Sequence, residues 1–223
     1  MASEGSSIAG LTMLVTLAAS VLFAELVGYL LHRLLHSDRL PALSRSHLIH
    51  HLALYGPLQP MRSPVYKNAT DDRPSLGNIG MEWIGPIAVV LALTWGTLTR
   101  IGVALPYRVV SLVTMVFWPL FMFSYLHDRM HLQNFWMERA PLLKCWFLRA
   151  RRLHDIHHHS LNDGGRMDHN FGIGFFLFDR IFGTLAKRHC PLNRHGYRAA
   201  LRRYKLERRD DEDFSDFPSC FRV

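Results

Sequence analysis

Three long apolar segments constrain the fold of this chain more than any other feature of its sequence. Residues 8–31 contain a single charged side chain, Glu25, and residues 109–126 contain none. Residues 83–99 form a third uncharged stretch. A helix of about 20 apolar residues crosses the roughly 30 Å hydrocarbon core of a bilayer. We therefore predict an all-α integral membrane bundle with about three spans.

The first apolar segment, and a further one at residues 173–186, allow other interpretations. The residues LAAS at 17–20 resemble a signal-peptide cleavage site, but the preceding MASEGSS has no Lys or Arg and the apolar run continues beyond that point. A retained membrane anchor is therefore expected. Residues 173–186 are also apolar, but they are few and include Asp179 and Arg180, which favours a buried or interfacial helix.

The basic residues indicate how the chain is oriented. Three crossings place residues 32–82 and 127–223 on one side of the membrane, and these hold all of the 26 Lys and Arg residues except Arg100 and Arg108. The positive-inside rule assigns this side to the cytoplasm. The net charge of +8 requires no nucleic acid partner, because anionic lipid headgroups at that side account for it.

The length of 223 residues suits a single domain. We predict one membrane-embedded unit over residues 1–223, in which 32–82 and 127–190 form a cytoplasmic histidine-rich cap and 191–223 a tail of mixed charge. The Pro-rich and polar stretch 54–78 is too long for a simple connector, and we expect it to cover a site or shape its entrance. The three cysteines have no paired spacing, which is typical of a reducing compartment.

Ten of the 14 histidines fall into four motifs with metal-ligand spacing. In a helix, residues i and i+4 share a face and i+3 is their neighbour, so HxxxH presents two imidazoles and HxxHH presents three. Neutral imidazole binds iron, zinc, copper and nickel. Ten are too many for one ion, and two metals with about five nitrogens each is the simplest partition. The candidate ligands are His32 and His36 (HRLLH), His47, His50 and His51 (HLIHH), His127 and His131 (HDRMH), and His154, His157 and His158 (HDIHH).

Six further residues are candidates for contacts around the ligands. Glu25 shares a helical stripe with His32 and His36, where its carboxylate can hydrogen-bond to a ligand histidine or connect to a partner helix. Asp128 and Asp155 each follow a candidate ligand and can fix the tautomer of a nearby ring, or simply be helix-surface charges. The remaining candidates are His159, His169 and Asn170, the last of which can instead form a turn.

Other cofactor sites do not fit the pattern. The chain has neither the HExxH of zinc proteases nor the Glu-x-x-His pairs of carboxylate di-iron bundles. Haem would require histidines within the spans. GIG at 172–174 lacks the third glycine of a dinucleotide fingerprint, so electrons must come from an external donor. Metal transport or storage is an alternative of a different class, but transport would require polar ligands at mid-membrane depth.

The four histidine motifs, together with NFG at 170–172 and FDRIFGT at 178–184, resemble the fatty acid hydroxylase and sterol desaturase superfamily. The likeness extends from about Glu25 to Thr184. It implies a membrane oxidoreductase of lipid biosynthesis, a monooxygenase or desaturase whose ten histidines hold two non-haem iron ions. Such enzymes use O₂ to oxidise an unactivated C–H bond of a fatty acyl or sterol-type lipid, or alternatively of a carotenoid. The implied electron donor is a cytochrome b5, ferredoxin or rubredoxin.

Overall fold

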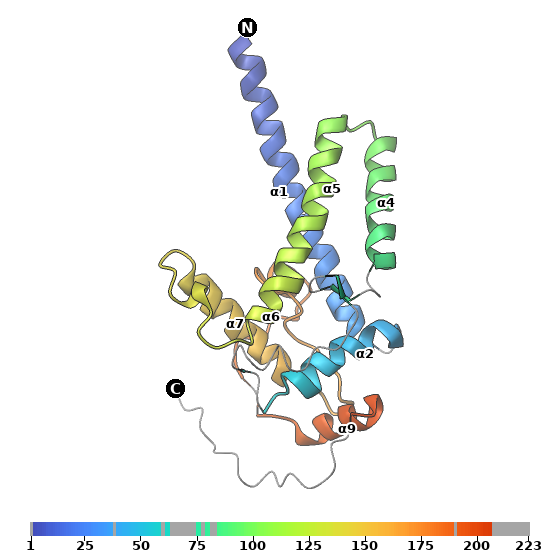
Figure 1. Ribbon diagram of the computed structural model, residues 1–223, viewed down its shortest axis with the longest axis vertical. Helices are drawn as coiled ribbons and strands as arrows, with labels where there is room; N and C mark the ends of the chain where they lie inside the picture. The colour runs from blue at the N-terminus through green and yellow to red at the C-terminus, as the bar shows by residue number, and fades with distance from the viewer. Residues whose placement is uncertain are drawn as a thin grey trace.

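The computed structural model describes residues 2–37, 39–58, 61–62, 75–76, 79–80, 84–189 and 191–206. Most of the stretch 54–78 lies outside these residues, so its expected covering role stays a prediction. Apart from a hairpin of two short strands, the regular elements of the described residues are all helices (Figure 1). The expected all-helical class is confirmed.

The first helix, α1 (Ala2–Leu35), is built from the first apolar segment of the sequence. Its part Ile8–Leu35 is long and apolar enough to cross a membrane. Leu11 and Leu14 are 64% and 66% exposed on the protein surface. A helix in the core of a soluble protein would bury such side chains, so this surface is suited to contact with lipid.

The second candidate span is a composite of three helices. The α-helix α5 (Leu105–Pro119) leads directly into the π-helix η3 (Leu120–Leu126) and then into α6 (His127–Arg129). Together, Leu105–Arg129 meet the length and hydropathy of a membrane span. Pro119 lies at the junction. Proline has no backbone N–H and so cannot donate the α-helical hydrogen bond, and the wider π-helical turns begin directly after it.

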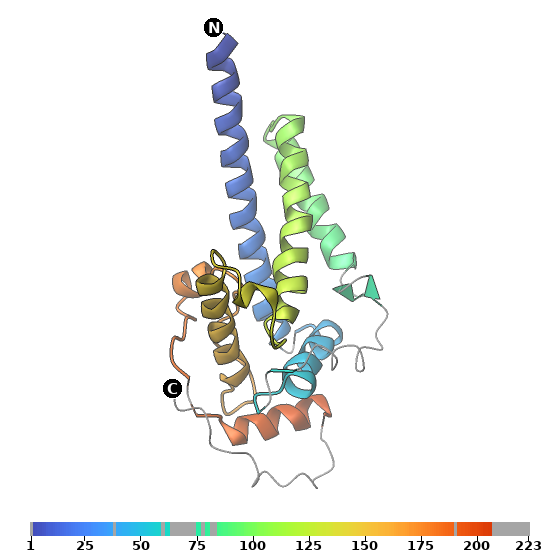
Figure 2. The ribbon, with the colours of Figure 1, turned by 60° about the vertical axis from the view of Figure 1, so that its left-hand side comes forward.

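The third predicted span is shorter than the other two. The helix α4 (Ile84–Arg100) has 17 residues, which gives a length of about 26 Å. It turns back at Gly102, whose φ of +75° favours glycine, and runs beside α5 (Figures 1 and 2). Where three spans were expected, the described residues contain two helices of spanning length and one shorter apolar helix.

The long helices approach closely along their lengths. The Ser20 hydroxyl donates to the Ser111 hydroxyl at 3.0 Å, which joins α1 to α5. Further along, a Cβ at Gly28 would lie 2.2 Å from the Phe123 ring, so glycine is required for this approach of α1 to η3. Small residues serve this purpose where two helices pack within a membrane.

A cap of short helices lies at one end of the spans (Figures 1 and 2). The two strands form an antiparallel hairpin that pairs Ser75 with Gly80. The elements of the cap and hairpin are α2 (Pro41–Ile49), the π-helix η1 (His50–Leu54), β1 (Ser75–Leu76), β2 (Ile79–Gly80), the 3-10 helix η4 (Trp136–Glu138), α7 (Lys144–His159), α8 (Leu177–Ile181) and α9 (Arg194–Tyr204).

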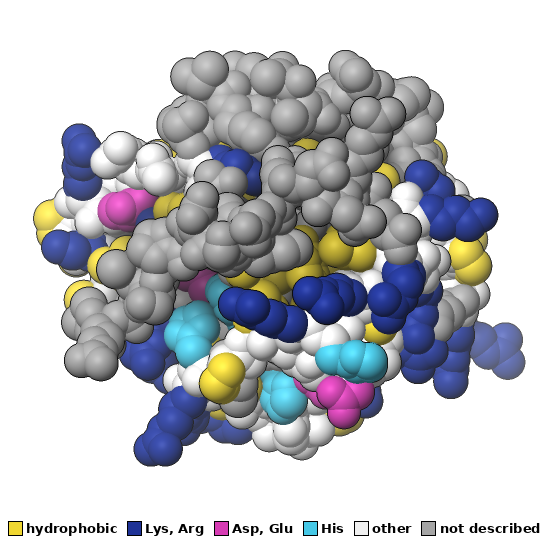
Figure 3. Space-filling model, turned by 90° about the horizontal axis from the view of Figure 1, so that it is seen from below, with side chains coloured by type: hydrophobic (Ala, Val, Ile, Leu, Met, Phe, Trp, Pro, Cys, Tyr) yellow, Lys and Arg dark blue, Asp and Glu magenta, His cyan; other side chains and the backbone are white. Residues whose placement is uncertain are grey.

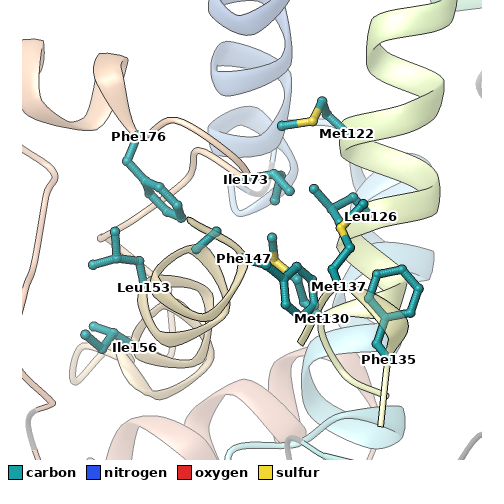
Figure 4. Packing of buried hydrophobic residues seen from close by; sticks show 11 residues of the cluster. Met122, Leu126, Met130, Phe135, Met137, Phe147, Leu153, Ile156, Ile173 and Phe176 are labelled. Atoms are coloured by element: carbon teal, nitrogen blue, oxygen red, sulfur yellow. The ribbon is translucent and has the colours of Figure 1, made fainter. Parts of the chain in front are cut away.

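Two apolar clusters hold the cap together. The larger one packs α7 against η3 and the segment that follows α6, and its central side chains Phe147, Leu126 and Ile173 are completely buried (Figure 4). The smaller one joins α9 to α2 and η1 through residues such as Ala200 and Leu52. Because α6, α7 and η1 carry histidines, these clusters fix the backbone from which the histidines project.

Candidate metal centre

The ten histidines of the four motifs meet where the spans join the cap. All ten are buried or half-buried, although imidazole is a polar group. Five of the rings have no exposed surface at all: His51, His131, His154, His157 and His158. Buried polar groups require partners, so the arrangement of the ring nitrogens is the central feature of the site.

The ten rings divide into two groups of five. In the first group, the Nε2 atom of His36 lies 3.0 Å from those of His47 and His157, and His47 lies 3.0 Å from His51. The ring of His32 completes this group, with its centroid 4.7 Å from that of His157. The second group comprises His50, His127, His131, His154 and His158, whose potential ligand atoms all lie within 4.8 Å of one another.

Helical periodicity explains this division. Each HxxxH pair supplies one group, because i and i+4 differ by only about 40° around a helix. Thus His32, in the last turn of α1, and His36, directly after it, belong to the first group, whereas His127 and His131 belong to the second. In the two HxxHH motifs the middle histidine projects from a neighbouring angle and joins the other group. His50 therefore belongs to the second group and His157 to the first.

Backbone carbonyls fix the tautomers of three rings. The Nδ1 atoms of His32 and His157 contact the carbonyl oxygens of Phe171 and His169, each at 2.5 Å. The Nδ1 atom of His158 lies 2.8 Å from the carbonyl oxygen of Tyr55. A carbonyl oxygen only accepts, so each Nδ1 carries the hydrogen and donates it. The Nε2 lone pairs of these neutral rings then point into the groups, as in metal-ligating histidines.

The electrostatics of the site also favour neutral imidazole. Burial, and then repulsion among neighbouring rings, hold the pKa of His36 and His51 well below the usual 6.5. The same causes lower the pKa of four further cap histidines, with the carbonyls of His169 and Tyr55 opposing the shift at His157 and His158. These further histidines are His50, His154, His157 and His158.

Hydrogen bonding alone does not satisfy the ring nitrogens. The Nε2 atoms of His51, His47, His36 and His157 form a chain with three contacts of 3.0 Å. His157 accepts, so His36 must donate to it and then has no in-plane lone pair to offer His47. The Nε2 atom of His32 is moreover buried without a hydrogen-bond partner. A bound cation would accept a lone pair from every ring, so the donor set fits a metal better than a hydrogen-bond network.

Three of the six neighbouring candidates carry carboxylates: Glu25, Asp128 and Asp155. Glu25 accepts from Trp118 Nε1 at 2.7 Å, so it connects α1 to α5, the partner-helix interpretation. Asp128 is half-buried at the start of α6. Burial raises the pKa of Asp155 to about 7, with Arg151 opposing the shift, and its buried Oδ1 has no hydrogen-bond partner among the described residues.

The other three candidates act through the backbone or lie outside the groups. His159 contacts the Asp155 carbonyl at 2.8 Å. The His169 ring pairs with the exposed Asp168, while its carbonyl holds His157. Asn170 is completely buried with φ of +57°, and its amide bonds the backbone of Leu153 and Ala186. The turn-forming interpretation of Asn170 therefore agrees with its contacts better than metal contact.

The sequence interpretation missed a buried carboxylate that positions the first group. Asp179 accepts from the backbone N–H groups of Phe171 and Gly172 at 2.7 Å and from the Thr184 hydroxyl at 2.8 Å. It thereby holds the segment whose Phe171 carbonyl binds His32. A charged residue within the apolar run 173–186 was the available signal, but it was used only as evidence against a span.

Comparison with known proteins agrees with this geometry. The model of the fatty acid hydroxylase family matches residues 73–184, which is just over half of the chain. The match includes the last two histidine motifs and the segment around Asp179, whereas the first two histidine motifs precede it. Neither a curated protein nor a solved structure shows a significant match to the chain.

Proposed function

Because this chain belongs to the fatty acid hydroxylase family, we propose that it is a membrane enzyme that uses two iron ions and O₂ to hydroxylate or desaturate a lipid. The proposed substrate is a fatty acyl or sterol-type lipid, and the proposed place of the reaction is lipid biosynthesis. The apolar helices of spanning length support a site that receives its substrate from the bilayer.

The observation that carries this proposal is the pair of histidine groups. Five imidazoles in each group supply enough nitrogen donors for one transition-metal ion with a coordination position to spare. We propose all ten as ligands: His32, His36, His47, His51 and His157 for one ion, and His50, His127, His131, His154 and His158 for the other. Bound iron would supply the O₂ activation and C–H oxidation that no side chain performs.

The protein's own contribution is to prepare and shield the ligands. Burial keeps the rings neutral and excludes water from the centre. The carbonyls of Phe171, His169 and Tyr55 keep three rings in the tautomer that offers Nε2. The ring of Tyr55 also stacks on His131, with centroids 4.2 Å apart, which restricts that ring's rotation.

Both reactions require electrons from outside the chain. Hydroxylation consumes O₂, two electrons and two protons and forms an alcohol and water, whereas desaturation removes two hydrogens from the lipid and forms two waters. We propose a small carrier of the cytochrome b5, ferredoxin or rubredoxin type as donor. Lys and Arg side chains are spread over the face of the cap opposite the spans (Figure 3). This supports a cytoplasmic position for the centre and an acidic partner.

The residues around the groups complete the proposed domain. We propose that His169 and Asn170 act as supports, the first through its carbonyl and the second through its backbone hydrogen bonds. Glu25 would hold α1 against α5 through Trp118, so that His32 keeps its position relative to the membrane and to the other ligands. Asp128, Asp155 and His159 would act on the helices that carry ligands and would not bind metal themselves.

The test combines metal analysis with lipid analysis of the full chain. Protein purified in mild detergent is expected to contain about two iron ions per chain. Cells that express it should accumulate an O₂-dependent lipid product, heavier by one oxygen for hydroxylation or lighter by two hydrogens for desaturation. Each of the ten His→Ala variants should lose most of that product, because a missing ligand distorts its metal site.

Matched controls are available on the cap surface. His189→Ala and His195→Ala change exposed rings and should leave metal content and product unchanged. One tightly bound ion per chain, or full activity in several of the ten variants, would contradict the two-iron proposal. A carotenoid product would redirect the substrate assignment, and altered metal uptake without any lipid product would favour transport or storage.

A further inference from the structure

The short helix α8 lies at the depth of the membrane spans. The Phe175 ring, just before α8, stacks on Trp118 with centroids 6.0 Å apart. The Phe182 ring, just after it, stacks on Tyr29 at 5.3 Å. Trp118 and Tyr29 belong to the two candidate spans. The views of Figures 1 and 2 agree that the cap rises beside the last turns of α1 and α5.

At this depth α8 and the residues that flank it expose apolar side chains on the protein surface. Phe175, Ile181 and Phe182 are 54%, 61% and 48% exposed, whereas the one acidic residue, Asp179, is completely buried. An exposed apolar surface of this kind is typical of contact with another molecule or a membrane. Because the neighbouring spans are surrounded by lipid, the contact partner at this level is the bilayer.

A basic pocket lies between α8 and α7, next to this apolar surface. It has a volume of about 240 Å³ and is lined by Arg149, Arg180, Trp146 and Phe175. The Trp146 Nε1–H donates to the Gly174 carbonyl at 3.1 Å and so fixes one wall. Neither arginine has an acidic partner among the residues that the structure describes.

The chemistry of the pocket selects its ligand. Guanidinium groups match phosphate oxygens through paired N–H donors, and two of them without a carboxylate favour an anion. The volume is below the range of about 300–1,000 Å³ that holds a whole drug-sized molecule, so the pocket suits a headgroup. Trp146 at its edge fits the preference of tryptophan for the membrane interface.

We propose that α8 is embedded in the interface of the bilayer and that Arg149 and Arg180 bind the phosphate of an anionic phospholipid. This lipid site is separate from the histidine groups and does not depend on the proposed reaction. Zwitterionic phosphatidylcholine is expected to bind less well, because the positive charge of its choline group is repelled by the two guanidinium groups.

Native mass spectrometry of the full chain in detergent tests the headgroup site, with phosphatidylglycerol and phosphatidylcholine as probes. The double variant Arg149→Gln/Arg180→Gln is expected to bind phosphatidylglycerol at least tenfold more weakly and phosphatidylcholine unchanged. The matched control, Arg198→Gln/Arg202→Gln, alters two exposed arginines of α9 and should change neither. Unchanged phosphatidylglycerol binding in the first variant overturns the site. Displacement of the lipid by inorganic phosphate at equal concentration overturns the lipid assignment.

A second measurement tests the embedding of α8 and needs no arginine variant. In a chain whose Cys145, Cys190 and Cys220 are replaced by Ser, a spin label on Ile181→Cys in lipid nanodiscs should collide readily with O₂ and rarely with a water-soluble nickel chelate. A label on Arg202→Cys in α9 should show the opposite preference. A nickel-accessible, oxygen-poor label at position 181 overturns the membrane-embedded position of α8.

Discussion

Replacing Asp179 by Asn should weaken the first histidine group although Asp179 touches no histidine of it. The carboxylate bonds the backbone N–H groups of Phe171 and Gly172, and the Phe171 carbonyl accepts from His32. Burial raises the pKa of Asp179, and its three hydrogen-bond donors act in the opposite direction. The Asn side chain is almost the same size, so the substitution changes hydrogen bonding while leaving packing intact.

The magnitude follows from the three bonds. An amide keeps one oxygen, which can retain Phe171 N–H and the Thr184 hydroxyl, but its NH₂ then faces the Gly172 N–H, donor to donor. The lost bond to a charged group is worth about 1.5–3 kcal/mol, and this figure includes leaving a buried N–H unpaired. Displacement of the Phe171 carbonyl should reduce metal affinity or activity by about 10 to 100-fold, as for other partners of metal-ligating histidines.

The assay is retention of iron during dialysis against a chelator, followed in parallel with thermal unfolding and lipid product. Asp179→Asn should release metal from a still-folded protein faster than the wild type. Asp168→Asn is the matched control, because that carboxylate lies nearby but is 47% exposed and pairs with the His169 ring. Wild-type retention of both ions and full activity in Asp179→Asn would refute the positioning role.

Three further predictions concern stability. Asn170→Ala removes three hydrogen bonds of a buried side chain to Leu153 and Ala186, and we expect a loss of about 2–4 kcal/mol in unfolding free energy, measured by denaturant titration. Trp118→Phe leaves the Glu25 acceptor without its donor and should cost about 1–3 kcal/mol in thermal unfolding, whereas the lipid-facing Phe117→Leu should have little effect. Metal-free protein should lose stability as the pH falls below about 6.5, because histidines with a depressed pKa bind protons only in the unfolded state. Each such histidine lowers the free energy of unfolding by up to about 1.4 kcal/mol per pH unit. A free energy of unfolding that stays constant between pH 7 and 5 would contradict this prediction.

The sequence was sufficient to predict the features that depend on local periodicity. Runs of apolar residues predicted the positions of α1 and of α5 with η3, and the structure places helices there. The spacing of the histidines predicted that the first and last ring of each motif lie together, but the middle ring of each HxxHH motif, His50 or His157, joins the other group. The expected partition into two sets of about five agrees with the arrangement of the rings, whereas metal binding itself and the identity of the metal stay predictions.

Features that depend on long-range contacts could not be predicted in the same way. Asp179 acts on Phe171 only because α8 folds back on the segment before it, and Tyr55 reaches His158 across 103 residues of chain. Glu25 was correctly singled out as a costly charge within a span. Its choice of Trp118 over a histidine, however, depends on the rotation of α5 relative to α1, which spacing along one helix does not specify.

The two HxxHH motifs determine how far apart the histidine groups lie. Each motif contributes to both groups, so part of the separation is set within η1 and within α7 by the fixed rise and rotation of one helix. A displacement of α7 therefore moves His157 and His158 together, and both groups respond. The HxxxH pairs that begin in α1 and in α6 each contribute to one group only. A displacement of α1 alone should consequently affect the first group selectively, whereas a substitution in the core beneath α7 should affect both groups.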